Sequence, residues 1–100
     1  MAKQVVWSFQ AQQDRKQILN YWRARNKSNV YSKKLNELFK DSIKLIAEFP
    51  QIGKSTDDHK ARIKKARDYL IIYEETANQI ILLAIWDTRQ NPDELKMILN

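Results

Sequence analysis

The stretch from residue 33 to residue 49 carries the strongest periodic pattern in the sequence. Its apolar side chains recur every three or four residues and its charged side chains lie mostly between them, as in a helix with one buried face. The stripe consists of Leu35, Leu38, Phe39, Ser42, Leu45, Ile46 and Phe49. Pro50 cannot continue a helix interior and Gly53 tolerates a positive φ, so the helix is expected to end in the turn FPQIG.

Shorter patterns on either side of this helix predict the other elements. Alternating apolar residues indicate strands, and runs of strong helix formers indicate helices. The expected elements are a strand over 3–9 with Val5, Trp7 and Phe9 on one face, a helix over 11–26, strands over 61–67, 69–75 and 79–87, and a short helix from Asn91. This order predicts one α+β domain over residues 1–100, β-α-α-β-β-β(-α), with an antiparallel-type sheet and both N-terminal helices on one sheet face.

The charge balance points to an anionic partner. The 100 residues include 18 basic and 12 acidic side chains, a formal net charge of +6, and no cysteine. Such a charge suits a nucleic acid, an acidic protein or a membrane surface, while the lack of cysteine excludes disulfides and thiolate chemistry. The N-terminus has no signal-peptide pattern and the longest apolar run covers only residues 80–86, so neither export nor a membrane span is expected.

The most basic segment comes directly before the strand over 69–75. It contains Lys60, Arg62, Lys64, Lys65 and Arg67, with no acidic residue among them. Strand alternation places Arg62 and Lys64 on one face, where we expect a single local patch. Such a patch either protects a sheet edge from aggregation or forms a docking surface for phosphate or carboxylate groups. No phosphate-binding loop and no metal-binding or hydrolase motif is present, so we expect no cofactor and no metal.

Several motifs in this order resemble the RelE/ParE superfamily of type II toxins. They are the order of elements, the FPQIG turn, the basic strand RIKKAR, the strand YLIIY and the segment IWDTRQNP. The resemblance covers about residues 3–95 and is to ParE-like plasmid stabilisation proteins in particular. It implies a small cytoplasmic protein that is encoded beside an antitoxin, which wraps and neutralises it.

The superfamily divides by target. RelE-like members cut mRNA on the ribosome, whereas ParE-like members bind DNA gyrase and lack the cutting residues. Carried over by position, Arg62 and Lys64 match basic residues of the nuclease branch and Arg89 matches its late arginine. Leu70 stands where that branch has an arginine, and Leu95 falls about where it has a tyrosine. The resemblance thus favours a non-hydrolytic gyrase inhibitor. The alternative is a ribosome-dependent mRNA endonuclease in which Arg62, Lys64 and Arg89 are catalytic.

Other residues have a structural and a functional interpretation side by side. Leu70 and Ile72 are expected on the open sheet face, as an apolar pair that a protein covers. Asp87 and Arg89 form either a local brace or part of the site. His59 is a solvated loop residue or a substitute catalyst. The expected surface for target or antitoxin comprises Lys60, Arg62, Lys64, Lys65, Arg67, Leu70, Ile72, Asp87, Arg89 and Leu95.

Overall fold

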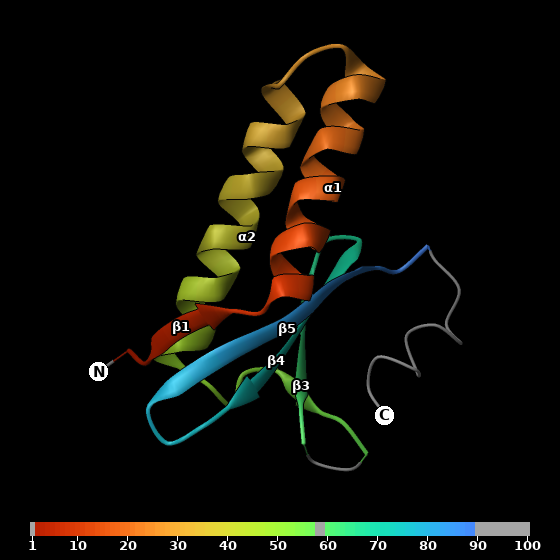
Figure 1. The fold of residues 1–100 in the computed structure, drawn as a ribbon. Coiled ribbons are helices and arrows are strands. Elements are labelled where there is room, and N and C mark those ends of the chain that lie inside the picture. The colour runs from red at the N-terminus through yellow and green to blue at the C-terminus, as the bar shows by residue number, and fades with distance from the viewer. Residues whose placement is uncertain (1, 58–59, 90–100) are drawn as a thin grey trace.

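Two helices and one five-stranded sheet make up the described part of the chain. The structure is a computed structural model that describes residues 2–57 and 60–89. The elements are β1 (Gln4–Trp7), α1 (Phe9–Asn26), α2 (Val30–Glu48), β2 (Lys54–Ser55), β3 (Arg62–Ala66), β4 (Tyr69–Glu75) and β5 (Gln79–Asp87). The helices form a hairpin whose near end packs on the sheet and whose far end extends beyond it (Figure 1). The predicted α+β class is therefore confirmed.

The sheet is mixed rather than purely antiparallel. Its strand order is β1-β5-β4-β3-β2, and β1 pairs with β5 in parallel while every other pair is antiparallel. The strands β2 to β5 follow one another through short connections, which enforce antiparallel pairing. Along the chain, the helical hairpin lies between β1 and β2. No short connection therefore forces β1 to run antiparallel to its neighbour in the sheet. The strand β2 was not predicted, because two residues are too few to show a period.

The first strand ends earlier than its alternating pattern suggests. Phe9 was expected on the strand's apolar face, but it lies in the first turn of α1 with 77% of its surface exposed. Ser8 is the cause, since its hydroxyl accepts a hydrogen bond from the Ala11 N–H at 3.0 Å and caps the helix. The chain therefore turns into α1 before Phe9 can join the sheet.

The apolar face of α2 is rotated relative to the predicted stripe. Its buried residues are Ser32, Leu35, Phe39, Ile43, Ile46 and Ala47. Leu45 and Phe49 are instead 37% and 58% exposed, so the prediction was wrong for these two positions. One residue corresponds to about 100° around a helix, so Leu45 points well away from Ile46.

The sheet has apolar residues on both faces. The larger cluster joins the helices to the sheet face that carries Tyr69, Ile71 and Tyr73. Trp7 and Trp22 pack against this cluster. A smaller cluster on the opposite face is built from Ala61, Ile72, Ala84 and Trp86, with Ile63, Leu70 and Leu83 packed against it.

Candidate functional site

The basic strand β3 divides its charges between the two faces of the sheet. Arg62 pairs with Tyr73, and Lys64 with Ile71, so both basic residues lie on the helix-bearing face. Lys65 pairs with Leu70 and lies on the other face. The predicted alternation is correct, but the basic residues do not form one patch. A partner that contacts all of them has to reach around the edge of the sheet.

Arg62 is tied to the turn that follows α2. Its Nη1 donates to the carbonyl of Gly53 at 2.8 Å and approaches that of Gln51 at 3.4 Å. The Tyr73 hydroxyl accepts from the Gly53 N–H at 2.9 Å and donates to the Pro50 carbonyl at 2.7 Å. Burial raises the pKa of Tyr73 above 10.0, although the Gly53 bond and the Arg62 charge oppose that shift. We call these five residues the turn clamp.

Gly53 is required in the turn clamp for its small size. A Cβ atom at this position would lie 2.6 Å from the Tyr73 hydroxyl oxygen. Its φ is not positive, in contrast to the sequence-based expectation. The sequence signal was present, since this is the single glycine of the chain, but the close approach of Tyr73 depends on the fold.

The remaining basic residues of this segment lie near the outer edge of the sheet. The strand β2 pairs only with Arg62 and Ile63, so among residues 2–57 and 60–89 no strand lies beside the rest of β3 on that side. Lys64 is half-buried and its Nζ donates to the Lys65 carbonyl at 3.2 Å, while Lys65 itself is exposed. Arg67 is exposed in the two-residue turn to β4, with a positive φ of 55°. Lys60 is exposed just before the strand.

Asp87 and Arg89 form a bidentate ion pair at the end of β5. The Arg89 Nε and Nη2 atoms lie 2.9 and 2.8 Å from the two Asp87 carboxylate oxygens, and the Arg89 N–H donates to Oδ1 at 2.9 Å. Hydrogen bonding to Arg89 lowers the pKa of Asp87 below its ordinary value and raises the pKa of Arg89. The Arg89 guanidinium also lies 5.5 Å from the centre of the Trp22 ring, within cation–π range.

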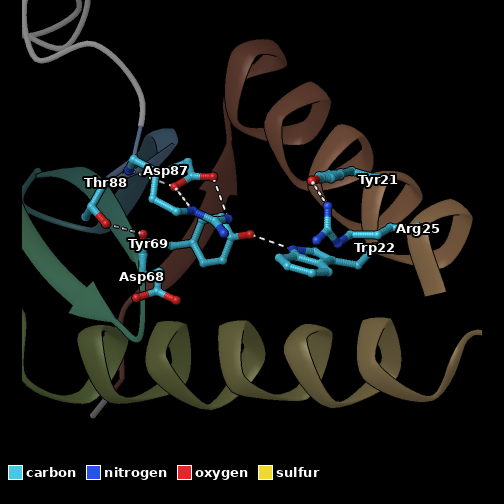
Figure 2. A network of polar contacts seen from close by, with 8 residues as sticks. Tyr21, Trp22, Arg25, Asp68, Tyr69, Asp87 and Thr88 are labelled. Carbon is cyan, nitrogen blue, oxygen red and sulfur yellow. Dashed lines mark hydrogen bonds and ion pairs between the residues drawn. The ribbon is translucent and has the colours of Figure 1, made fainter.

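Trp22 connects α1 to this end of the sheet. Its Nε1–H donates to the Tyr69 hydroxyl at 2.8 Å, and Figure 2 shows the two side chains facing each other. Tyr69 is only 2% exposed, and burial raises its pKa above 10.0 although the Trp22 bond acts in the opposite direction. Trp22 also stacks on Tyr21 and meets Tyr31 edge-on, with ring centres 5.1 and 4.9 Å apart. The bond to Tyr69 joins side chains 47 residues apart in the chain, so no local sequence pattern indicates it.

Arg62 and Arg89, two of the three basic residues matched to the nuclease branch, lie at opposite ends of the sheet, and Lys64 lies between these ends, opposite Ile71. Arg62 pairs with Tyr73 and Asp87 with Tyr69, and these two partners are separated along β4 by about 13 Å of strand. Arg62 is bound to the turn clamp at one end, and Arg89 is bound to Asp87 at the other. Within the described residues, the two guanidinium groups do not converge on one point.

The face opposite the helices carries Leu70 and Ile72, as predicted. Ile72 is completely buried, so of this pair only the half-buried Leu70 offers apolar surface to a partner, next to the half-buried Ile63 and Leu83. A hollow of about 430 Å³ lies beside it. Its lining consists of Lys54, Ser55, Thr56, Asp57, Ile63, Lys65 and Leu70.

Some predicted features lie outside the part of the chain that the structure describes. These are His59, Leu95 and the short helix from Asn91. Over residues 2–57 and 60–89, no group of three or more His, Cys, Asp or Glu side chains is placed to hold a metal ion. Neither helix of these segments is long and apolar enough to cross a bilayer.

Replacing Asp87 with asparagine is expected to lower the free energy of unfolding at neutral pH by about 0.5–1 kcal/mol, as for other exposed ion pairs. The folded-state pKa of Asp87 lies below its ordinary value of 3.8, so the ion pair stabilises the fold above that value. This contribution is lost as the pH falls through the lowered pKa. Urea unfolding should therefore give Asp87→Asn and wild-type midpoints that differ at neutral pH and converge in strong acid. Asp41→Asn, at an exposed position, is the control; a difference that persists in acid would contradict the assignment.

Comparison with known proteins identifies relatives of this fold. Residues 5–92 match the profile of the family described as ParE toxin of type II toxin-antitoxin system, parDE. A solved structure of the chromosomal ParDE TA system from P. aeruginosa superposes with a TM-score of 0.74 at 12% sequence identity, over 88% of this chain and 98% of that chain. At this identity, the superposition shows a shared fold. No curated protein sequence matches the chain.

Proposed function

Because the chain belongs to the ParE toxin family of type II toxin-antitoxin systems, we propose that it arrests growth by binding DNA gyrase without hydrolysing a substrate. A cognate antitoxin neutralises it in the cytoplasm. The family match over residues 5–92 supports the toxin role. The choice of a binding mechanism rests on the separation of Arg62 from Arg89.

Cleavage of RNA by its own 2′-hydroxyl requires a base, an acid and cations that converge on one phosphate. The observed placement of Arg62 and Arg89 does not meet that requirement, because each guanidinium is bound to its own end of the sheet. Leu70, at the position where the nuclease branch has an arginine, is a hydrocarbon that can neither transfer a proton nor stabilise a phosphate. These observations support a binding toxin over an endonuclease.

The basic residues of the β3 segment are the proposed contact surface for the target or antitoxin. Lys65 and Arg67 are exposed, and Leu70 adds apolar surface beside Lys65. A partner that meets this surface should be acidic, and its affinity should include a component that weakens with salt. Equal affinity at low and high salt would contradict this electrostatic part.

Pulse labelling after induction without antitoxin tests the proposed target. Thymidine incorporation is expected to fall first, while amino-acid incorporation initially continues. An early loss of amino-acid incorporation would contradict gyrase as the target and favour the ribosome-dependent endonuclease. Arrest of neither process would contradict the toxin proposal.

The matched control for this experiment is a variant that cannot fold. Phe39 is completely buried in α2, so Phe39→Asp places an unpaired charge in the core. This variant should leave both incorporation rates unchanged. A supercoiling assay with purified gyrase then checks the target directly, since wild-type protein should inhibit it and Phe39→Asp should not.

A further inference from the structure

A basic groove runs along α1 beside the first strand. It has a volume of about 520 Å³ and is lined by Trp7, Gln12, Gln13, Arg15, Lys16, Leu19, Asn20 and Arg23. Three of these residues are cationic, three carry amide groups and two are apolar, and no carboxylate is among them. We refer to these eight residues as the α1 groove.

The cations of the α1 groove are not neutralised within the described residues. The ion pairs of that part of the chain are Lys3–Glu75, Lys40–Glu37 and Arg89–Asp87, none of which involves the groove. The only acidic residue of α1 is Asp14, whose carboxylate accepts from the Ile85 N–H at 3.0 Å and the Gln10 amide at 2.7 Å. Asp14 lines the hollow next to β5 instead of the groove. The positive charge of the groove is therefore available to a ligand.

The residues of the groove are arranged along one side of the helix. Gln12, Lys16, Asn20 and Arg23 follow at intervals of four, four and three residues, and so span about 16 Å on successive turns. At one end, the Arg15 guanidinium lies 5.1 Å from the centre of the Trp7 ring. This contact holds one cation beside an aromatic surface, which fixes its position for recognition of an anion.

The groove also lies at an edge of the sheet. β1 is a terminal strand, and the Trp7 carbonyl accepts a bond from the Gln12 side-chain amide at 3.3 Å. That carbonyl is already bonded, but the apolar side chains of Trp7 and Leu19 can cover apolar side chains of an extended peptide, and the amide groups of the lining can bond its backbone. A phosphate backbone needs neither feature. The observations therefore favour a polypeptide over a nucleic acid.

We propose that the α1 groove binds an acidic segment of a partner polypeptide. Carboxylates of that segment meet Arg15, Lys16 and Arg23, and its apolar side chains pack on Trp7 and Leu19. The groove is separate from the basic segment of β3, because β5 and β4 lie between β1 and β3 in the sheet. The proposed function would make this partner the antitoxin, and only that identification rests on it.

Nuclear magnetic resonance locates the binding site on the wild-type protein. The full chain has three tryptophans, Trp7, Trp22 and Trp86, whose indole N–H signals can be assigned by replacement with phenylalanine. A short peptide in which glutamates alternate with leucines is the probe. Its addition should shift the Trp7 signal and leave those of Trp22 and Trp86 in place. Shifts at Trp22 or Trp86 without a shift at Trp7 would overturn the proposal.

Charge reversal tests whether the groove cations supply the affinity. Lys16→Glu/Arg23→Glu should weaken binding of the same peptide roughly tenfold, since two exposed ion pairs with its carboxylates are lost. Lys33→Glu/Lys34→Glu is the matched control, with the same change of net charge at exposed positions of α2 outside the groove. It should weaken binding less than threefold, roughly what long-range screening allows.

Two results of this comparison would overturn the proposal. Equal losses in both variants would mean that net charge alone attracts the peptide. Binding of a single-stranded DNA oligonucleotide that depends on Lys16 and Arg23, with no such dependence for the peptide, would assign the groove to nucleic acid. Neither result depends on toxicity, so a failure here is distinguishable from a failure of the proposed function.

Discussion

Replacing Gly53 with alanine is expected to destabilise the fold by about 3 kcal/mol, at the upper end of the cost of overpacking. The new Cβ would lie 2.6 Å from the Tyr73 hydroxyl oxygen and 2.8 Å from its Cε1, and Tyr73 is completely buried. The ring cannot move away without losing its bonds to Gly53 and Pro50. A shift of the turn that contains Gly53 would also disturb the Arg62 contact with the Gly53 carbonyl.

The measurement is the free energy of unfolding from urea titration of wild type and Gly53→Ala. Gln51→Ala is the control, because Gln51 is exposed and contributes only its backbone carbonyl to the turn clamp, so the change should alter stability by less than about 0.5 kcal/mol. Adding Tyr73→Phe to Gly53→Ala should restore only part of the loss, since the ring carbons remain 2.8 and 3.0 Å from the Cβ. A Gly53→Ala protein as stable as wild type would contradict the turn clamp.

Local sequence patterns were sufficient to predict the larger elements of this fold. β4 and β5 have the expected bounds, because their apolar alternation and polar connections are contained within each segment. Local patterns predicted less well which face of α2 is buried. Leu45 and Phe49 fit the helical period, yet the direction of burial is decided by which side of α2 meets the sheet. The parallel pairing of β1 with β5 likewise joins residues about 75 positions apart, such as Val5 and Ile80.

The candidate site was predictable in composition but not in arrangement. Charge alone located the basic segment of β3, and strand alternation separated Arg62 from Ile63. The turn that binds Arg62 and the distance between Arg62 and Arg89 both depend on strand register, which no local pattern reveals. The α1 groove was missed for a similar reason, since Trp7 and Lys16 belong to different elements and meet only after folding.

Trp22→Ala is the second substitution with a large expected effect, about 3 kcal/mol, near the lower end for tryptophan truncation because this side chain is half-buried. The change removes the packing on Tyr31 and Tyr21 and leaves the buried Tyr69 hydroxyl without its donor. Tyr21→Ala is the control, since Tyr21 is 47% exposed and should contribute about 1 kcal/mol or less. Equal losses of unfolding free energy in the two variants would contradict a special role for Trp22.

Trp22→Phe separates the hydrogen bond of Trp22 from its packing. The bond to Trp22 lowers the pKa of Tyr69 against the effect of burial, so losing the donor should raise that pKa further. A tyrosine whose folded-state pKa is raised stabilises the fold below the ordinary value of 10.0, and the stabilisation is lost as the pH rises through the folded-state pKa. Spectrophotometric titration should thus show Tyr69 ionising at higher pH in Trp22→Phe than in wild type, with Tyr73 unchanged because its bonds lie in the turn clamp. A lower ionisation pH for Tyr69 would mean that the variant admits water to the end of the sheet, so that loss of burial outweighs loss of the donor.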